Sequence, residues 1–304
     1  MNVLVTGATG FLGRHLCSRL LEIGADIWTC NTKIGNLHDY NGLVTLCVGL
    51  KFDYIFHLAA STKAGTYCLS HQGDQYLANL QLNTNILKFW HERQPQAKLI
   101  AIGTSCGYDP GLEKKEDNFL KGEPFYDLYT YAMTKRMLLL GAQMLSKQYG
   151  LKYLYYIPST LYGPMFDVED SHFIFDLIKK IYAGKNHNQP VKLWGTGNQK
   201  RELTYVGDAV NIIMQTLHLE NESVNLCCGQ EYSIKHYANL ISDIYNYDQT
   251  KIEYDTTQYE GVASKVLCAE KLHKLLPNYQ FTPLEIGIKN TIYYYNEKIS
   301  ANVF

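Results

Sequence analysis

The stretch VTGATGFLG, residues 5–13, decides how the chain begins to fold. It follows Val3–Val5, which is typical of a buried strand, and it leads into residues 13–23, whose apolar side chains recur at helical spacing. The three glycines permit a tight turn and let the backbone approach a pyrophosphate. The start of the helix then offers amide groups and the positive end of its dipole to the phosphates. The stretch therefore predicts a nucleotide-binding turn between a strand and a helix.

Strand-like and helix-like stretches continue to alternate as far as residue 157. This order predicts an α/β fold, a doubly wound parallel sheet of the Rossmann type with helices on both faces. Such sheets bind ligands outside the carboxyl ends of their strands. The expected strands are residues 27–29, 54–59, 98–103 and 153–157, and the expected helices include residues 76–93 and 128–149.

After Pro158 the pattern is looser, with helical stretches at residues 171–183, 208–219 and 233–246 and a turn-rich stretch at 191–204. We expect residues 1–160 to form an NADP-binding domain. Residues 161–304 are expected to form mainly a smaller α/β substrate-binding domain, with the possibility that part of them returns to the first domain.

The composition excludes several classes of partner. The 304 residues carry a net charge of −1 without a long basic or acidic block, which argues against nucleic acid and anionic membranes. No apolar run is long enough to cross a bilayer, and the chain starts directly with a strand, leaving no room for a signal peptide. The eight cysteines form no CxxC and no zinc-ligand spacing. We expect reduced thiols, no metal and a cytoplasmic location.

The residues after the second expected strand bear on the choice of cofactor. A carboxylate that binds the ribose diol of NAD normally follows this strand, but the sequence here is WTCNTK, residues 28–33. Asn31 and Lys33 can bind a 2′-phosphate instead, which favours NADPH, although Lys33 can equally be a solvated loop residue. Asp39 is a candidate for binding the adenine amine or for capping a helix.

YAMTK places Tyr131 and Lys135 four residues apart, on one face of an expected helix. An ammonium near a phenol favours the phenolate, and such a Tyr can pass a proton to a carbonyl that receives a hydride. This spacing is common by chance in a chain with 25 Tyr. The glycine turn and the hydroxyl of Thr104 in GTSCGYDP, residues 103–110, favour a catalytic role, since Thr104 can hold the substrate carbonyl beside Tyr131.

With these motifs the chain resembles the extended short-chain dehydrogenase/reductases over nearly its whole length. Further matches are HLAA at 57–60, LYGP at 161–164 and RELTYVGD at 201–208. The resemblance implies a homodimer that pairs the helices 76–93 and 128–149 across a two-fold axis. It also implies a set of cofactor-binding residues: Gly7, Thr9, Gly10, Phe11, Leu12, Gly13, Asn31, Lys33, Asp39, Leu58, Ala59, Ala60, Tyr131, Lys135 and Pro158.

Within that family the chain is similar to the GDP-L-fucose synthases in TSCGY, YAMTK, SHFI and LWGTGNQKREL. This similarity implies that Cys106 and His172 move protons at the carbons flanking a sugar ketone. It also places Lys179, Trp194, Arg201 and Lys265 along the nucleotide-sugar site. The chain departs from the pattern in Thr160 before LYGP, where Asn is usual, in Asp109, where Pro is usual, and in Lys179 and Lys180, where an Arg is expected.

The resemblance implies NADPH-dependent reduction of the C4 ketone of a GDP-linked 4-keto sugar, with or without 3,5-epimerisation, in the synthesis of sugars for surface polysaccharides. One alternative reduces only, accepting a sugar such as a heptose that another enzyme has epimerised. A 4-epimerase or a 4,6-dehydratase is a further alternative, although a dehydratase is expected to carry an acidic pair at Cys106–Gly107. A non-catalytic NADP sensor is disfavoured because Tyr131 and Lys135 are both present.

Overall fold

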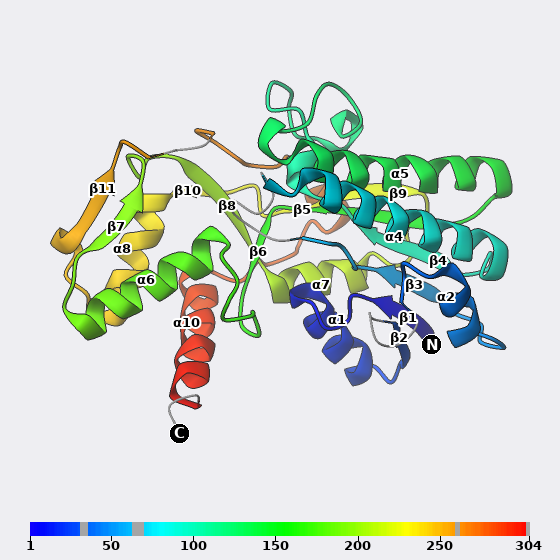
Figure 1. The fold of residues 1–304 in the computed structure, drawn as a ribbon, viewed down its shortest axis with the longest axis horizontal. Helices are drawn as coiled ribbons and strands as arrows, with labels where there is room; N and C mark the ends of the chain where they lie inside the picture. Colours follow the sequence, from blue (N-terminus) through cyan, green and yellow to red (C-terminus); the bar gives the residue numbers. More distant parts are fainter. Residues whose placement is uncertain (31–35, 63–69, 259–261, 302–304) are drawn as a thin grey trace.

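The computed structural model describes residues 1–30, 36–62, 70–258 and 262–301. Two layered units lie side by side (Figure 1). One contains the main sheet with helices on both faces, and the other contains two small sheets and three longer helices. Among the described residues, none of the helices has the length and apolar character needed to cross a membrane.

The main sheet has six strands, and every neighbouring pair is parallel. The strand order is β2-β1-β3-β4-β5-β9, so that the order reverses at β1. This arrangement confirms the predicted Rossmann-type fold, and it places the expected ligand crevice at the carboxyl ends of β1 and β3. The strands are β1 (Asn2–Thr6), β2 (Asp26–Cys30), β3 (Tyr54–His57), β4 (Lys98–Ile102), β5 (Tyr153–Pro158) and β9 (Glu222–Leu226).

Helices cover both faces of this sheet because successive side chains of a strand point to opposite faces. Leu4 packs in a core cluster with residues of α4 and α5, whereas Val3 and Val5 pack in a cluster with residues of α1 and α7. Helices α4 and α5 also contact each other (Figure 1). These helices are α1 (Phe11–Glu22), α4 (Gln72–Arg93), α5 (Tyr129–Tyr149) and α7 (Val206–Gln215), and α2 (Tyr40–Leu46) packs against α4.

The second unit has a three-stranded sheet of order β10-β8-β6 and a parallel pair, β11-β7. A third core cluster lies between these strands and the helices α6, α8 and α10. The strands are β6 (Thr160–Tyr162), β7 (Val191–Trp194), β8 (Lys200–Tyr205), β10 (Glu231–Ser233) and β11 (Ile252–Asp255). The helices are α6 (Phe173–His187), α8 (Ile234–Tyr245) and α10 (Leu284–Ala301), and α9 (Glu270–Leu275) lies against β9.

Two features of this half differ from a reading of local pattern. Residues 191–204, expected to be turn-rich, contain β7 and most of β8. In β7, Val191 and Leu193 are buried and alternate with exposed residues, as is typical of a strand. Strand β9 and helix α7 come from beyond residue 160 but lie in the main sheet and on its face. The second half of the chain therefore contributes to both units.

Four short 3₁₀ turns complete the secondary structure of the described residues. Three of them lie in the long connection between β4 and α5, which carries several of the predicted site residues. They are η1 (Ser105–Gly107), η2 (Glu116–Asn118) and η3 (Tyr126–Leu128), and η4 (Gln249–Lys251) precedes β11. The seven cysteines within the described ranges are all free.

Candidate active site

The turn after β1 is so tightly packed that a side chain at Gly7 or Gly13 would collide with the neighbouring backbone. Gly7 has a φ of +73°, and a Cβ there would lie 2.7 Å from the amide nitrogen of Ala59. A Cβ at Gly13 would lie 2.1 Å from the carbonyl oxygen of Gly7. Helix α1 begins at Phe11 without a side-chain cap. Its first amide groups are therefore directed at the turn, where they suit the phosphates of a dinucleotide.

The other predicted cofactor residues lie around this turn or at neighbouring strand ends. Thr9 accepts a hydrogen bond from Arg14 Nη1 through its carbonyl (2.9 Å), and the Phe11 ring meets Phe175 of α6 edge-on. Gly10, Leu58, Ala59 and Ala60 lie on the same turn or on the one after β3. Leu12 is the second residue of α1, and Pro158 is the last residue of β5.

The predicted contacts to the adenosine side are only partly within the structure. Asp39 caps α2, since its carboxylate accepts a hydrogen bond from the amide of Asn41 (3.0 Å). Asp39 is expected either to bind the adenine amine or to cap a helix, and the structure shows the hydrogen bond of the helix cap. Asn31 and Lys33 lie outside the described residues.

The predicted Tyr–Lys pair lies at the start of α5. Lys135 is buried, and its Nζ donates to the carbonyl oxygen of Ile102 at the end of β4 (2.8 Å). Burial lowers the pKa of Lys135 to about 8, so the ammonium form still dominates at neutral pH. Tyr131 is half-buried and lies one helical turn earlier. Burial raises the pKa of the neighbouring Tyr155, and the proximity of Tyr131 raises the pKa of Tyr155 further. The pair therefore stands at a strand end, where parallel sheets bind ligands.

Thr104 lies two residues beyond β4, at the same edge of the sheet. Its Oγ1 accepts a hydrogen bond from the amide of Cys106 (3.3 Å) and so caps the turn η1. This contact uses an oxygen lone pair rather than the hydroxyl proton. The hydroxyl thus keeps a proton with which it can hold a carbonyl oxygen.

Cys106 and Lys265 form a pair that the sequence does not predict. Lys265 Nζ lies 3.3 Å from Cys106 Sγ and 5.1 Å from the centre of the Phe125 ring. Both residues line a cavity of about 280 Å³, which also involves Ser105, Tyr108, Pro110, Lys114, Phe125 and Val262–Ser264. Lys265, which the resemblance assigns to the nucleotide sugar, thus meets the predicted acid–base thiol.

Asn225 of β9 is a buried side chain that holds the two sides of this cavity together. Its Oδ1 accepts from Tyr108 Oη (2.7 Å), and its Nδ2 donates to the carbonyl oxygens of Lys114 (2.9 Å) and Cys268 (3.0 Å). The loop after β4 and the segment after β11 are therefore fixed to one strand. No strand is expected at residues 222–226 from the sequence, and Asn225 is not among the predicted site residues. An Asn between the apolar Val224 and Leu226 is the signal that could have identified it.

Two carboxylates fix the segment that carries Lys265. Glu231 accepts a hydrogen bond from the amide of Lys265 (3.1 Å). Glu202, which is 1% exposed, accepts from the amides of Leu267 (2.9 Å) and Gly229 (2.6 Å). Burial raises the pKa of Glu202 to about 7. The position of Lys265 thus depends on strands β8 and β10 of the second unit.

His172 lies immediately before α6, and about half of its side chain is exposed. Its Nδ1 is hydrogen-bonded to Asp170, whose carbonyl oxygen also accepts from Lys179 Nζ (2.6 Å). Lys179 therefore shapes the loop that presents His172. Within the described part of the chain, none of the hydrogen bonds or ring contacts joins His172 to Cys106.

The last two predicted substrate residues lie on β7 and β8. Trp194 is 56% exposed, and its carbonyl oxygen accepts from Gln199 Nε2 (3.2 Å). Arg201 Nη1 donates to the carbonyl oxygen of Val262 (2.8 Å). Arg201 thus connects β8 with the segment that ends at Lys265, on the side of the second unit that faces the cavity.

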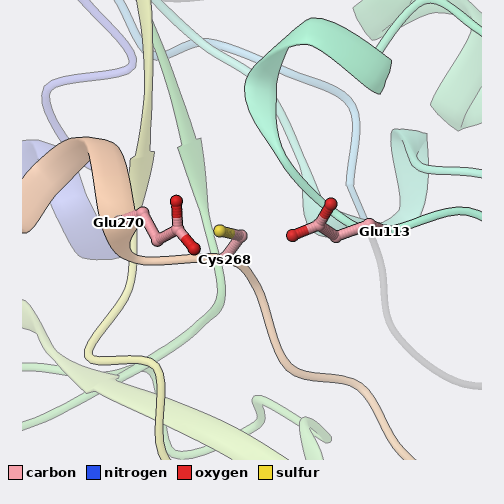
Figure 2. Close-up of side chains that lie close together, drawn as sticks. All are labelled: Glu113, Cys268 and Glu270. Carbon is pink, nitrogen blue, oxygen red and sulfur yellow. The ribbon is translucent and has the colours of Figure 1, made fainter.

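A further group of side chains could offer ligands to a metal ion. Atoms of Glu113, Cys268 and Glu270 lie within 4.8 Å of one another, with the two carboxylates flanking the sulfur (Figure 2). Glu113 is already paired with Lys115 (2.9 Å), and burial raises the pKa of the Cys268 thiol, which favours its protonated form. The group lies at the surface where the two anchored segments meet, and we assign it no metal.

The fold and this site define a class of protein. A parallel sheet with a glycine turn at its switch point, next to a Tyr–Lys pair and a Thr hydroxyl, is the arrangement of an enzyme that uses a nicotinamide dinucleotide. The sequence model of the NAD dependent epimerase/dehydratase family matches residues 3–227, and the chain belongs to that family. The predicted membership of the extended short-chain dehydrogenase/reductases is thereby confirmed.

Relatives with established names cover almost the whole chain. A GDP-L-fucose synthase from Dictyostelium discoideum is 26% identical over 299 residues, spanning 95% of this chain and 93% of the relative. A GDP-L-colitose synthase from Yersinia pseudotuberculosis is 28% identical over 314 residues, spanning 98% and 99%. The crystal structure of a GDP-L-fucose synthetase from Naegleria fowleri bound to NADP has a TM-score of 0.88 at 25% identity, over 98% of this chain and 93% of the other.

Proposed function

We propose that the protein reduces the C4 ketone of a GDP-linked 4-keto sugar with NADPH, and that it also epimerises the carbons flanking this ketone. The observation that carries the proposal is the hydrogen bond from Lys135 to the carbonyl of Ile102 at the carboxyl end of β4, two residues before Thr104, with Tyr131 one helical turn before Lys135 on α5. The GDP-sugar class is supported by the names of the relatives, and NADPH by the ligand of the Naegleria protein.

For the reduction, the Thr104 hydroxyl donates a hydrogen bond to the ketone oxygen and holds that oxygen next to Tyr131. Bound NADPH supplies the hydride to the ketone carbon. Tyr131 gives its phenolic proton to the oxygen, which completes the alcohol. The Lys135 ammonium stabilises the phenolate that remains, and Ile102 fixes the direction of that ammonium. The site thus stabilises the negative charge that develops on the ketone oxygen in the transition state.

For the epimerisation, the Cys106 sulfur acts as the base, in its thiolate form. A C–H bond next to the ketone breaks, an S–H bond forms, and the electron pair moves into an enolate whose oxygen Thr104 and Tyr131 hold. The contact from Lys265 Nζ suits a negatively charged sulfur. His172, to which the resemblance also gives a role in proton transfer, then returns a proton to the opposite face in this proposal.

One observation favours a second candidate, a reductase that does not epimerise. The His172 side chain is hydrogen-bonded to Asp170 in the same loop, and none of the described hydrogen bonds of His172 reaches Cys106. By the resemblance, the departures at Thr160 and Asp109 also lie beside the sugar. Such an enzyme accepts a GDP-4-keto sugar, for example a heptose, that has been epimerised elsewhere.

One experiment separates these functions. The protein is incubated in heavy water with GDP-4-keto-6-deoxymannose, first without and then with NADPH. Deuterium at the flanking carbons before NADPH is added, followed by reduction, supports the bifunctional enzyme. Reduction of a pre-epimerised ketone without any deuterium uptake supports the reductase alone. Absence of both reactions across a panel of GDP- and dTDP-4-keto sugars contradicts the proposal.

We also propose that the enzyme is a cytoplasmic homodimer that pairs α4 and α5 with the same helices of a second copy. Apolar side chains on the outer faces of these helices are exposed: Leu77 by 66%, Leu140 by 38% and Met144 by 49%. Burying them is favourable by the hydrophobic effect. Light scattering coupled to size exclusion tests this, and Met144→Glu is expected to yield monomers.

A further inference from the structure

A chain of buried polar side chains crosses the main unit from β1 to α5. Thr6 Oγ1 lies 2.8 Å from His57 Nδ1, and His57 Nε2 lies 3.0 Å from Asn83 Oδ1. Asn83 Nδ2 donates to the carbonyl oxygen of Thr134 (3.0 Å). Each of these four residues is less than 5% exposed. Buried polar groups cost free energy unless they are paired, so this arrangement is specific.

The donor and acceptor of each hydrogen bond in this series can be assigned by starting from the Thr134 carbonyl. The carbonyl of Thr134 can only accept, which makes the Asn83 amide nitrogen the donor and turns Asn83 Oδ1 toward His57. His57 Nε2 must therefore carry the proton, and Nδ1 accepts from the Thr6 hydroxyl. Burial, with the charge of Lys135 as a smaller cause, lowers the pKa of His57 to about 3. The imidazole is thus neutral and fixed in one tautomer.

Both ends of the chain lie at the site. Thr6 Oγ1 accepts from the amide of Ala59 (3.3 Å), the residue against which Gly7 is packed. At the other end, Thr134 Oγ1 donates to the carbonyl oxygen of Tyr131 (2.7 Å), and Thr134 immediately precedes Lys135. The hydrogen bonds therefore run from the cofactor turn to the helical turn that carries the catalytic pair.

We propose that His57 and Asn83 are positioning residues that set the Tyr131–Lys135 turn relative to the Gly7–Ala59 turn. Apolar side chains of the same volume could fill this space, and replacing buried polar groups in this way is often neutral or stabilising. Directional hydrogen bonds instead fix the distance between the two turns. The neutral imidazole also avoids a second positive charge beside Lys135. The inference rests on the proposed catalytic role of Tyr131 and Lys135.

The first test replaces Asn83. Asn83→Leu keeps the branched shape and the number of side-chain heavy atoms, but His57 Nε2–H loses its acceptor and the Thr134 carbonyl loses the Asn83 donor. Asn85→Leu is the matched control. Asn85 lies two residues further along α4, and its Nδ2 donates to the carbonyl oxygen of Leu37, which is not part of the hydrogen-bonded series from Thr6 to Thr134. Reduction of GDP-4-keto-6-deoxymannose, NADPH binding and thermal unfolding are measured for both variants.

Asn83→Leu is expected to lower kcat by about 100-fold, the scale of a misplaced catalytic group, while the NADPH Kd changes less than about 3-fold. The Asn85 control is expected to keep kcat within about 3-fold even where it unfolds at a lower temperature. Equal losses of kcat in the two variants, in proportion to their losses of stability, would show a structural role only and overturn the proposal.

A second measurement needs no substrate and does not depend on whether the Asn83→Leu variant folds. Nitrogen-15 NMR of the native protein reports the tautomer and charge of each imidazole, with His57 assigned by its absence in His57→Gln. The Nε2–H tautomer, uncharged from pH 8 down to pH 5, is expected. An Nδ1–H tautomer, or protonation near pH 6.5, would overturn the inference even if the protein turns over a different sugar.

Discussion

Lys265 Nζ lies 3.3 Å from Cys106 Sγ, although 159 residues separate the two in the chain. The thiol belongs to the turn after β4 and the ammonium to the segment after β11, and the cavity of about 280 Å³ lies between these segments. A substrate bound in this cavity would meet both groups at once. Under the proposed function, we therefore expect Lys265 to take part in proton transfer as well as to attract phosphate.

Replacing Lys265 is expected to separate exchange from reduction. Lys265→Met keeps the length of the side chain but removes the donor to the sulfur. Deuterium uptake at the flanking carbons, followed by NMR in heavy water, should slow by about 100-fold, the lower end of general acid–base catalysis. Reduction of a pre-epimerised ketone should fall much less. The control is Lys274→Met on α9, whose Nζ lies near exposed Glu270. Equal effects on both reactions would mean that Lys265 only binds the substrate.

Tyr131→Phe removes the proposed proton donor and leaves the ring in place. Turnover should fall by about two to four powers of ten, the usual worth of general acid–base catalysis. The NADPH Kd should stay nearly constant, since the glycine turn is untouched. Tyr129→Phe, at the more exposed start of the same helix, serves as the control and should keep its activity. Near-full turnover of Tyr131→Phe would assign the proton to another group.

The choice of cofactor is tested at Lys33. The chain has no carboxylate directly after β2, and Asp39 is used as a helix cap. NADPH should therefore bind more tightly than NADH, and Lys33→Ala should narrow the difference while leaving NADH affinity unchanged. Fluorescence titration with both cofactors measures this, with Lys51→Ala as the control. Tighter binding of NADH to the native protein would reject the prediction.

The buried Glu202 gives stability a pH dependence of known sign. Burial raises its pKa from 4.5 to about 7, so the folded protein holds a proton that the unfolded chain releases in this window. Its contribution therefore falls as the pH rises from 4.5 to 7, by about 3 kcal/mol in all. Glu202→Gln should remove this slope in urea unfolding at several pH values. A variant whose slope matches that of the native protein would contradict the assignment.

His57 makes the free energy of unfolding depend on pH with the opposite sign. The native protein must therefore be compared with Glu202→Gln. Its folded pKa of about 3 lies below the ordinary 6.5, so its contribution is complete above pH 6.5 and declines as the pH falls toward 3. The two contributions oppose each other between pH 4.5 and 6.5. The difference between native protein and Glu202→Gln isolates the carboxyl.

The local pattern of the sequence predicts the glycine turn, the parallel sheet and the helix face of Tyr131 and Lys135, because these depend on neighbours within a few residues. It does not predict the contacts that complete the site. Asn225 binds groups 43 to 117 residues away, and no periodicity records such partners. Lys265 was assigned by resemblance to the nucleotide sugar, and only the folded chain brings its ammonium to the Cys106 sulfur. Strand β9 joins the main sheet by pairing with β5, which lies far earlier in the sequence, and no local pattern records that pairing.

Asn225 also bears on how the polypeptide acquires its structure during synthesis. A nascent chain that ends at residue 160 contains the first five strands of the main sheet, but β5, which pairs with β4 on one side, still lacks β9 on the other. The Tyr108 hydroxyl and the Lys114 carbonyl then lack the side chain that later binds both. We therefore expect the loop that carries Cys106 to reach its final position only after β9 has been synthesised. A fragment cut at residue 160 is therefore expected to expose a sticky sheet edge rather than to fold as a free-standing cofactor-binding module.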